Sequence, residues 1–214
     1  MSTNTNLEEI IRKGITQFLE TIEEAKLFAQ VSIIDSYYLE INERIQTSVR
    51  ILDKKLSHMD TDEQTDNYFK KLGELGFTPD EAVYDSLLHT VSVGISAYEV
   101  SKMFLCLILD KPNANVNETM SLGVLLSKLG GKLYSDKKLI KNLVDFFDVD
   151  FRNKLAHEKW WCKDKLFYYV DEDDNNAVKQ LTMKELQGKL IRISMISKYL
   201  SDIYIEKYQS KYAT

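Results

Sequence analysis

The feature that most constrains the fold is one long apolar segment that begins at a strong helix-start signal. Thr78, Pro79 and Glu81 are typical of a helix N-terminus, because threonine caps the first turn, proline fits the first helical position and glutamate closes a capping box. The sequence DKPNAN then ends the helix near Leu109. Between Leu87 and Leu107 the segment is apolar on most sides. A helix of this kind must be buried, so we predict a helical bundle built around it.

Most of the remaining chain also predicts helices. Glycine and proline are scarce, at 8 and 2 residues of 214, so long helices meet few breaks. Apolar residues recur at helical spacing from Leu7 to about Lys55, and a break near residues 32–36 would give a hairpin rather than one bent helix. A polar loop is expected over 57–67, and further helices over 68–75, 118–129, from 135 onward through about 159, and 182–208.

One segment departs from the helical pattern. Residues 161–170 are aromatic and β-branched, and with the turn-rich DEDDNNA they predict a short hairpin that returns through 178–181. The predicted fold class is therefore mainly α: an up-and-down helical bundle with a short β-hairpin inserted. We expect a helical bundle domain over 77–214 and an N-terminal helical extension over 1–76. The apolar stripe of that extension needs burial, which favours dimer contacts or partner binding.

Charge and cysteine content narrow the function. The net charge of −5 argues against a broad basic face that coats nucleic acid. Two cysteines are too few for a disulfide framework or a structural zinc site, and we expect no metal and no cofactor. The sequence shows neither a secretion signal nor an unbroken apolar run of about 18 residues, so a cytoplasmic protein without membrane contact is expected.

The charge balance reverses locally between Arg152 and Lys165. Five basic residues stand there against two acidic ones, within and after the sequence DFRNKLAHEKWW. On a helix, at about 100° per residue, Arg152, Asn153 and His157 share one face, and Phe151 and Leu155 share the opposite one. The small side chain of Ala156 lies among the polar three and leaves room for a ligand or a partner helix.

These residue types suit one kind of chemistry. Arg152 is a permanent cation whose planar donors match phosphate oxygens. His157 can take or give a proton near neutral pH. Asn153 could orient the imidazole or contact a phosphate. A cation and a proton shuttle are the minimal set for attack of an RNA 2′-OH on its own phosphate. The alternative is a solvated helix face with no chemistry.

The string from Arg152 to His157, RNKLAH, resembles the Arg-X4-His signature of the HEPN superfamily, often Arg-Asn-X-X-Ala-His. The helix containing AYEVSKMFLCLIL, the segment SLGVLLSKLG and a closing helix extend the similarity over about 79–208. The resemblance implies a metal-independent endoribonuclease of the kind found in toxin–antitoxin pairs, abortive infection and other antiviral defence. It also implies a homodimer in which two motifs face one composite cleft, with RNA as substrate and an antitoxin or defence-system protein as partner.

The resemblance assigns roles to individual residues. Arg152 and His157 would be catalytic, with Asn153 in support. Glu99 matches an acidic position of the earlier helix, although an exposed helix carboxylate is an equal interpretation. Some HEPN toxins carry a tyrosine two residues after the histidine, where this chain has Lys159.

Three further side chains are candidates for RNA contact: Lys154, Lys159 and Trp160. For the tryptophan, packing onto helices is the alternative to stacking on bases. Two rival functions remain: a non-catalytic HEPN module that binds RNA or a nucleotide, and a helical interaction protein in which the motif only holds a dimer together.

Overall fold

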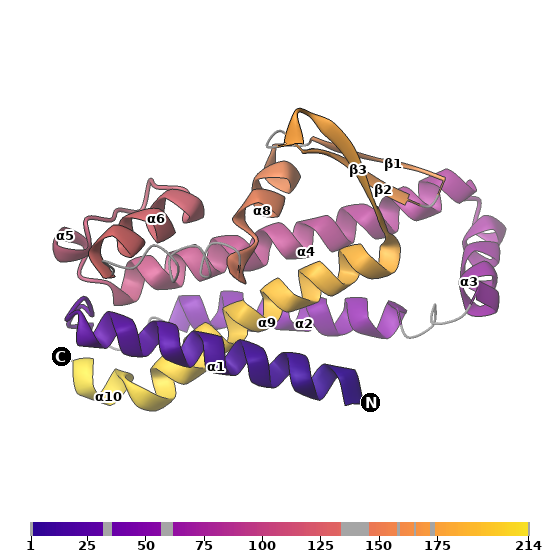
Figure 1. The fold of residues 1–214 in the computed structure, drawn as a ribbon. Coiled ribbons are helices and arrows are strands. Elements are labelled where there is room, and N and C mark those ends of the chain that lie inside the picture. Colours follow the sequence, from indigo (N-terminus) through magenta and orange to yellow (C-terminus); the bar gives the residue numbers. More distant parts are fainter. Residues whose placement is uncertain are drawn as a thin grey trace. The chain divides into compact units, whose positions relative to one another are not determined.

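The computed structural model describes residues 2–31, 36–56, 62–133, 146–157, 159–164, 166–171 and 174–213. The structure is mainly helical with one small antiparallel sheet (Figure 1). The elements, in chain order, are α1 (Ser2–Glu24), α2 (Ser36–Leu56), α3 (Asp62–Glu74), α4 (Pro79–Ile108), α5 (Lys111–Ala114), α6 (Leu122–Leu133), α8 (Val149–Ala156), β1 (Trp160–Lys163), β2 (Leu166–Asp171), β3 (Ala177–Thr182), α9 (Met183–Lys207) and α10 (Gln209–Tyr212).

The chain forms two compact units, and neither is a continuous stretch of sequence. Unit 1 comprises Met1–Glu43, Ala97–Val149 and Ile193–Thr214. Unit 2 comprises Arg44–Ser96 and Asp150–Arg192. The long helices α2, α4 and α9 therefore each contribute to both units. The predicted domain boundary between residues 76 and 77 stays a prediction.

Unit 1 buries the apolar stripe of α1. Five of its side chains are at most 3% exposed: Ile11, Ile15, Phe18, Leu19 and Ile22. In Figure 1, α1 runs beside the second half of α9 and α10. Glu8 contacts Tyr199 and Glu20 contacts Lys207, so α1 and α9 run in the same direction. The stripe of α1 is thus buried within the chain, and the expectation that the N-terminal extension makes dimer or partner contacts stays a prediction.

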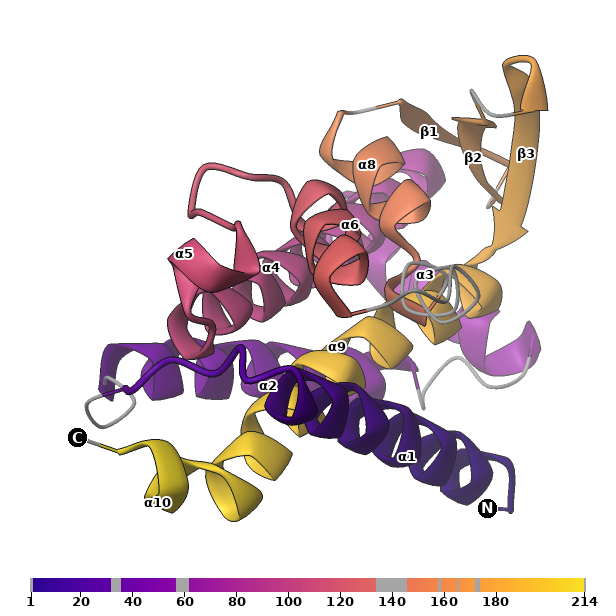
Figure 2. The same cartoon turned by 60° about the vertical axis from the view of Figure 1, so that its left-hand side comes forward.

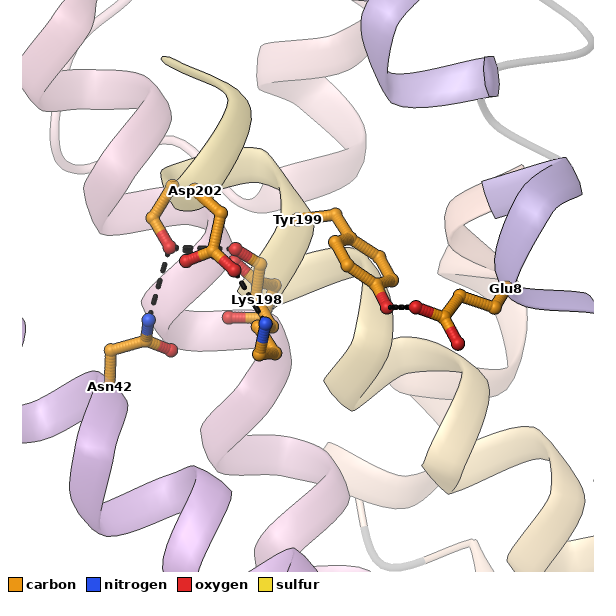
Figure 3. Close-up of polar contacts among 7 residues, drawn as sticks. Glu8, Asn42, Lys198, Tyr199 and Asp202 are labelled. Carbon is orange, nitrogen blue, oxygen red and sulfur yellow. Dashed lines mark hydrogen bonds and ion pairs between the residues drawn. The ribbon is translucent and has the colours of Figure 1, made fainter. Parts of the chain in front are cut away.

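Polar side chains on α9 connect it to two other helices of unit 1 (Figure 3). The hydroxyl of Tyr199 donates a hydrogen bond to the carboxylate of Glu8 on α1. The amide of Asn42 on α2 donates to Oγ of Ser201 over 3.1 Å, and both residues are buried. Burial raises the pKa of Tyr199 to about 12, with a further contribution from the nearby carboxylate of Glu8. These contacts fix the register of α9 against its neighbours.

Unit 2 has its own apolar core. Side chains from α4, α8, the sheet and α9 pack together there: Val83, Leu87, Val91, Phe151, Leu155, Phe167, Leu186 and Leu190. Gly94 allows a close approach between two helices of this core, because a Cβ atom at that position would lie 2.2 Å from Cδ2 of Leu190. The first half of α4 and the first half of α9 therefore pack closely, and α8 joins the same core.

The sheet has three strands in the order β1-β2-β3, all antiparallel (Figure 2). The predicted hairpin therefore has one strand too few, because residues 161–170, predicted as a single strand, belong to two strands in the structure. The backbone reverses at Asp164, which has a φ of 51°, so that Trp160–Lys163 pairs with Leu166–Asp171. A single aspartate inside an aromatic run is a weak turn signal, so the sequence did not indicate that the chain turns there and forms a third strand.

Local helix signals located several helix starts. Thr78 Oγ1 accepts from the N–H of Glu81, and the carboxylate of Glu81 accepts from the N–H of Thr78, which completes the predicted capping box before α4. Thr182 and Glu185 make the same box before α9, as predicted. The predicted end of the α3 helix at Gly76 is also confirmed, because this glycine has a φ of 95°.

Some helix limits differ from those predicted. α3 begins at Asp62, inside the region predicted as a loop, and α6 begins at Leu122 and continues through the glycine pair to Leu133. The first helix ends at Glu24 and the second begins at Ser36, so the N-terminal region forms two separate helices and not one bent helix. The helix predicted from residue 135 lies mostly outside the described residues.

By length and composition, one helix of the described ranges is long and apolar enough to cross a membrane: Asp80–Ile108. The sequence predicted no such helix, because it contains no unbroken apolar run. Within the structure 61% of the most apolar window of this helix is buried, and core helices of soluble proteins meet the same criterion. The expected absence of membrane contact stays a prediction.

Candidate functional site

The candidate site is built on the short helix α8. The helix starts at Val149, immediately after Asp148, whose φ of 46° breaks the preceding helical residues. The hydroxyl of Tyr98 donates a hydrogen bond over 2.9 Å to the main-chain oxygen of Asp148. This turn fixes where α8 begins and therefore which of its faces points to solvent. The first turn of α8 also carries Asp150, whose charge opposes anion binding at that end.

The two faces of α8 are those that helical spacing predicts. Phe151 and Leu155 are 3% and 1% exposed and belong to the core of unit 2. Phe151 meets the rings of Phe167 and Tyr169 edge-on, at centroid distances of 6.2 and 5.8 Å. On the other face Arg152 and Asn153 are half-buried, and His157 is exposed. The predicted separation of an apolar face from a polar one is confirmed.

Asn153 connects the other two residues of the motif. Its side-chain oxygen accepts a hydrogen bond from Nη1 of Arg152 over 3.2 Å. Its main-chain oxygen accepts from the N–H of His157 over 3.0 Å. The side chain of Asn153 therefore orients the guanidinium, whereas the sequence suggested that it orients the imidazole or contacts a phosphate. Its main chain holds the first residue after the helix in place.

The motif helix ends at Ala156, three residues earlier than predicted. The N–H of Lys159 donates to the oxygen of Lys154, a bond that closes the C-terminus of the helix. The oxygen of Lys159 in turn accepts from the N–H of Val170, which draws the chain into the sheet. His157 thus lies in the turn between α8 and β1, at the exposed end of the motif.

The structure separates the candidate RNA contacts into two kinds. The ammonium of Lys154 lies 2.9 Å from Oδ1 of Asp171, and the two side chains are only 12% and 13% exposed. Hydrogen bonds from Lys179 and from Lys154 lower the pKa of Asp171 to about 2. This ion pair competes with any phosphate contact by Lys154. The two lysines also differ in burial, because Lys159 is exposed and the side chain of Lys154 is 12% exposed.

Trp160 faces the core of unit 2. Its ring stacks on Phe167 with centroids 5.4 Å apart and on Tyr84 with centroids 6.4 Å apart. This is the packing alternative to base stacking, and it places Trp160 between the sheet and α4. The neighbouring Trp161 points to the opposite face of the sheet and is 40% exposed.

Glu99 belongs to unit 1, whereas Arg152 and His157 belong to unit 2. Its carboxylate lies 4.0 Å from the ammonium of Lys102, one helical turn away. Neither unit by itself contains Glu99 together with the motif, so its supporting role stays a prediction.

Sequence reasoning missed two residues next to the motif helix. Asp171 and Lys179 lie on neighbouring strands and bond to each other, and Asp171 also bonds to Lys154. The signal that could have found them is strand alternation, since Tyr169 and Asp171 share the face that covers α8. Using that signal requires the register of the sheet, which the predicted hairpin did not supply.

A surface cavity of about 440 Å³ in unit 2 contains none of the motif residues. Its lining includes Asp80, Glu81, Tyr84, Cys162, Lys163 and Asp164. Burial raises the pKa of the Cys162 thiol, and the carboxylates of Asp80 and Asp164 raise it further. The carboxylates make this cavity a poor place for a phosphate, and a thiol kept protonated is a weak nucleophile.

Comparison with known proteins finds no matching family model, no matching curated protein and no matching solved structure. Within the described ranges, no group of three or more His, Cys, Asp or Glu side chains is placed to hold a metal ion.

Proposed function

We propose that the protein is a metal-independent endoribonuclease of the HEPN type. The observation that carries the proposal is the arrangement on α8: Arg152 and His157 lie on the polar face, Asn153 contacts both, and the opposite face is anchored in the core. An anchored helix presents its polar side chains in a fixed geometry, which is what a catalytic site needs. The resemblance of the RNKLAH string supports the same function.

The proposed reaction is attack of a 2′-hydroxyl on the adjacent phosphate. The 2′-oxygen forms a bond to phosphorus, the bond to the 5′-oxygen of the next nucleotide breaks, and the products carry a 2′,3′-cyclic phosphate and a 5′-hydroxyl. One group removes the proton of the 2′-hydroxyl, and another gives a proton to the leaving oxygen. Arg152 binds the phosphate oxygens and stabilises their charge in the transition state.

Two proton transfers favour two copies of His157. A single imidazole cannot act as base and acid in the same step unless it moves its proton across the site. In a homodimer with one composite cleft, one His157 takes the first proton and its counterpart gives the second. The setting that we propose from the resemblance is cytoplasmic, in a toxin–antitoxin pair or in antiviral defence.

The test is cleavage of RNA by the full-length protein in the presence of EDTA. We expect products that end in a 2′,3′-cyclic phosphate, and loss of cleavage in Arg152→Ala and in His157→Ala. Arg44→Ala is the matched control, because it removes an exposed arginine far from the motif in sequence. Products with other ends, or cleavage that survives both motif substitutions, would refute the mechanism.

The same variants distinguish the rival functions. If the unaltered protein cleaves no RNA but binds it, and Arg152→Ala abolishes binding, the protein is a non-catalytic RNA-binding module. If it neither cleaves nor binds RNA, and the substitutions only dissociate a dimer in light scattering, the motif is an assembly surface. Either result would replace the nuclease proposal.

A further inference from the structure

The outer face of the sheet carries a second set of side chains that the motif does not use. Strand alternation and the pairing register assign eight residues to this face: Trp161, Lys163, Leu166, Tyr168, Val170, Val178, Gln180 and Thr182. The inner face packs on α8 through Phe167 and Tyr169. The outer face is the solvent side, and Trp161 and Val178 on it are 40% and 58% exposed.

Two aromatic rings stack on each other at the centre of this face. Trp161 and Tyr168 are cross-strand partners, their ring planes are 7° apart and their centroids lie 5.5 Å apart. Cross-strand aromatic pairs stabilise sheets, which is the structural role of such a pair. A partly exposed pair of parallel rings is also a surface on which nucleic acid bases stack, because every base has a flat π-face.

The side chains around the two rings include cations and an amide. The eight residues of the outer face include Lys163 and no carboxylate, although Lys163 also lines the cavity that contains Asp80 and Glu81. Lys159, immediately before β1, is exposed as well. Gln180 lies opposite Tyr168 and offers an amide for base edges. Cations next to stacked aromatic rings are the features that bind single-stranded nucleic acid.

We propose that the outer face of the sheet, centred on Trp161 and Tyr168, binds single-stranded RNA by base stacking. This site deepens the proposed function and rests on it, because it would hold the nuclease substrate outside the cleavage site. Trp161 takes one base on its exposed ring, Tyr168 supports that ring from the neighbouring strand, and Lys159, just before β1, meets the phosphate backbone.

The chain places this site close to the motif. Trp161 lies four positions after His157, so their Cα atoms are at most about 14 Å apart. The polar face of α8 and the outer face of the sheet point in opposite directions, because the inner face of the sheet lies against α8. A bound RNA strand therefore passes from one face to the other around the turn that contains His157 and Lys159. The two sites would then bind different parts of one strand that is longer than a dinucleotide.

The experiment measures binding to a fluorescein-labelled oligouridylate of about ten nucleotides with 2′-O-methyl groups, which cannot undergo 2′-hydroxyl attack. Anisotropy titrations with the full-length chain should show affinity at least about fivefold weaker for Trp161→Ala, because one base loses its stacking partner. Trp161→Phe keeps a ring and should keep most of the affinity. Val124→Ala is the matched control, since it removes an exposed apolar side chain on α6, outside the sheet, and should bind as the unaltered protein does.

Three outcomes would overturn the site. The first is that Trp161→Ala binds as tightly as the unaltered protein, and the second is that Val124→Ala is weakened as much as Trp161→Ala. The third is that the oligonucleotide does not bind and Trp161→Ala instead dissociates a dimer, which makes the face a contact between copies. Circular dichroism spectra that match between the variants confirm that each is folded.

Cleavage assays separate this proposal from the nuclease itself. Trp161→Ala should cleave a dinucleotide at the unaltered rate but show a higher KM for a longer RNA, because only the longer RNA reaches the sheet. If no RNA is cleaved by any variant but Trp161→Ala still loses affinity, the nuclease fails and the stacking site stands. If RNA is cleaved and Trp161→Ala has the unaltered KM and affinity, the stacking site fails and the nuclease stands.

Discussion

The ammonium of Lys154 lies 2.9 Å from Oδ1 of Asp171 and joins the motif helix α8 to the second strand of the sheet. Lys179, on β3, bonds to the other oxygen of the same carboxylate. One carboxylate therefore holds a helix and two strands together through two ammonium groups. Because Lys154 follows Arg152 and Asn153 directly, this contact also limits how the polar face of α8 can rotate.

Asp171→Asn should make the chain less stable at pH 7, and the difference from the unaltered protein should shrink in acid. The two lysines lower the pKa of Asp171 from an ordinary value of 3.8 to about 2, so the folded state favours the charged form. A lowered folded pKa contributes stability above the unfolded pKa, and that contribution is lost as the pH falls from about 4 towards 2. Urea unfolding at a series of pH values measures the difference.

Asp174→Asn is the control for that measurement. Its carboxylate is 60% exposed and contacts only one of the two lysines, Lys179, at 3.2 Å. Exposed single pairs contribute little, so this variant should differ from the unaltered protein by well under 1 kcal/mol at pH 7. If Asp174→Asn is as destabilised as Asp171→Asn, or if the effect of Asp171→Asn does not change with pH, the two-lysine ion pair is not the cause.

Gly94→Ala should destabilise the chain, whereas Gly188→Ala should stabilise it. A Cβ atom at Gly94 would lie 2.2 Å from a methyl group of Leu190, which is 1% exposed, so the leucine side chain would have to shift within the core. Overpacking of this kind costs about 1–3 kcal/mol and exceeds the gain in helix propensity. Gly188 has no atom within 4 Å of its added Cβ, so alanine there should gain about 0.5–1 kcal/mol. Thermal unfolding measures the change in stability of each variant. A gain in stability for both variants would contradict the close approach of the helices.

Local signals in the sequence predicted the helix starts and the two faces of α8. A capping box needs only residues three positions apart, and the burial of Phe151 and Leu155 needs only the helical period. Both are decided by neighbours within one turn. The start of α3 at Asp62 shows the limit of this reasoning, because a polar acidic segment has the composition of a loop and yet forms a helix.

The part that could not be predicted depends on residues far apart in the sequence. Lys154 meets Asp171 only because β2 lies where the turn at Asp164 places it. Trp160 and Trp161 are neighbours of the same type, and the sequence does not say which one faces the core. Strand register decides that question, and a change of register by one residue exchanges the two faces. The prediction that Lys154, Lys159 and Trp160 contact RNA could therefore not take the register of the sheet into account.

Ser201→Ala should destabilise unit 1 by about 1–3 kcal/mol, because it leaves the buried amide of Asn42 without its acceptor (Figure 3). Asn42 is 8% exposed, so water does not readily replace the lost hydroxyl. Ser48→Ala is the matched control: its hydroxyl bonds only to the main chain of its own helix, at Arg44, and its loss should change stability by less than about 0.5 kcal/mol. Chemical unfolding of Ser201→Ala, of Asn42→Ala and of the double variant measures the coupling. Additive effects would show that the two side chains act independently.

Lys159 and Lys154 should differ in how they affect RNA binding, if the chain binds RNA as we propose. Lys159 is exposed beside His157, whereas Lys154 is held by Asp171. In anisotropy titrations at several salt concentrations, Lys159→Gln should flatten the slope of log affinity against log salt by about 0.7, the value for one phosphate contact to a single strand. Lys154→Gln should leave the slope unchanged and instead lower stability, because Asp171 loses a partner. A flattened slope for Lys154→Gln alone would mean that RNA displaces Asp171 from this lysine, and the ion pair would then be part of the binding site.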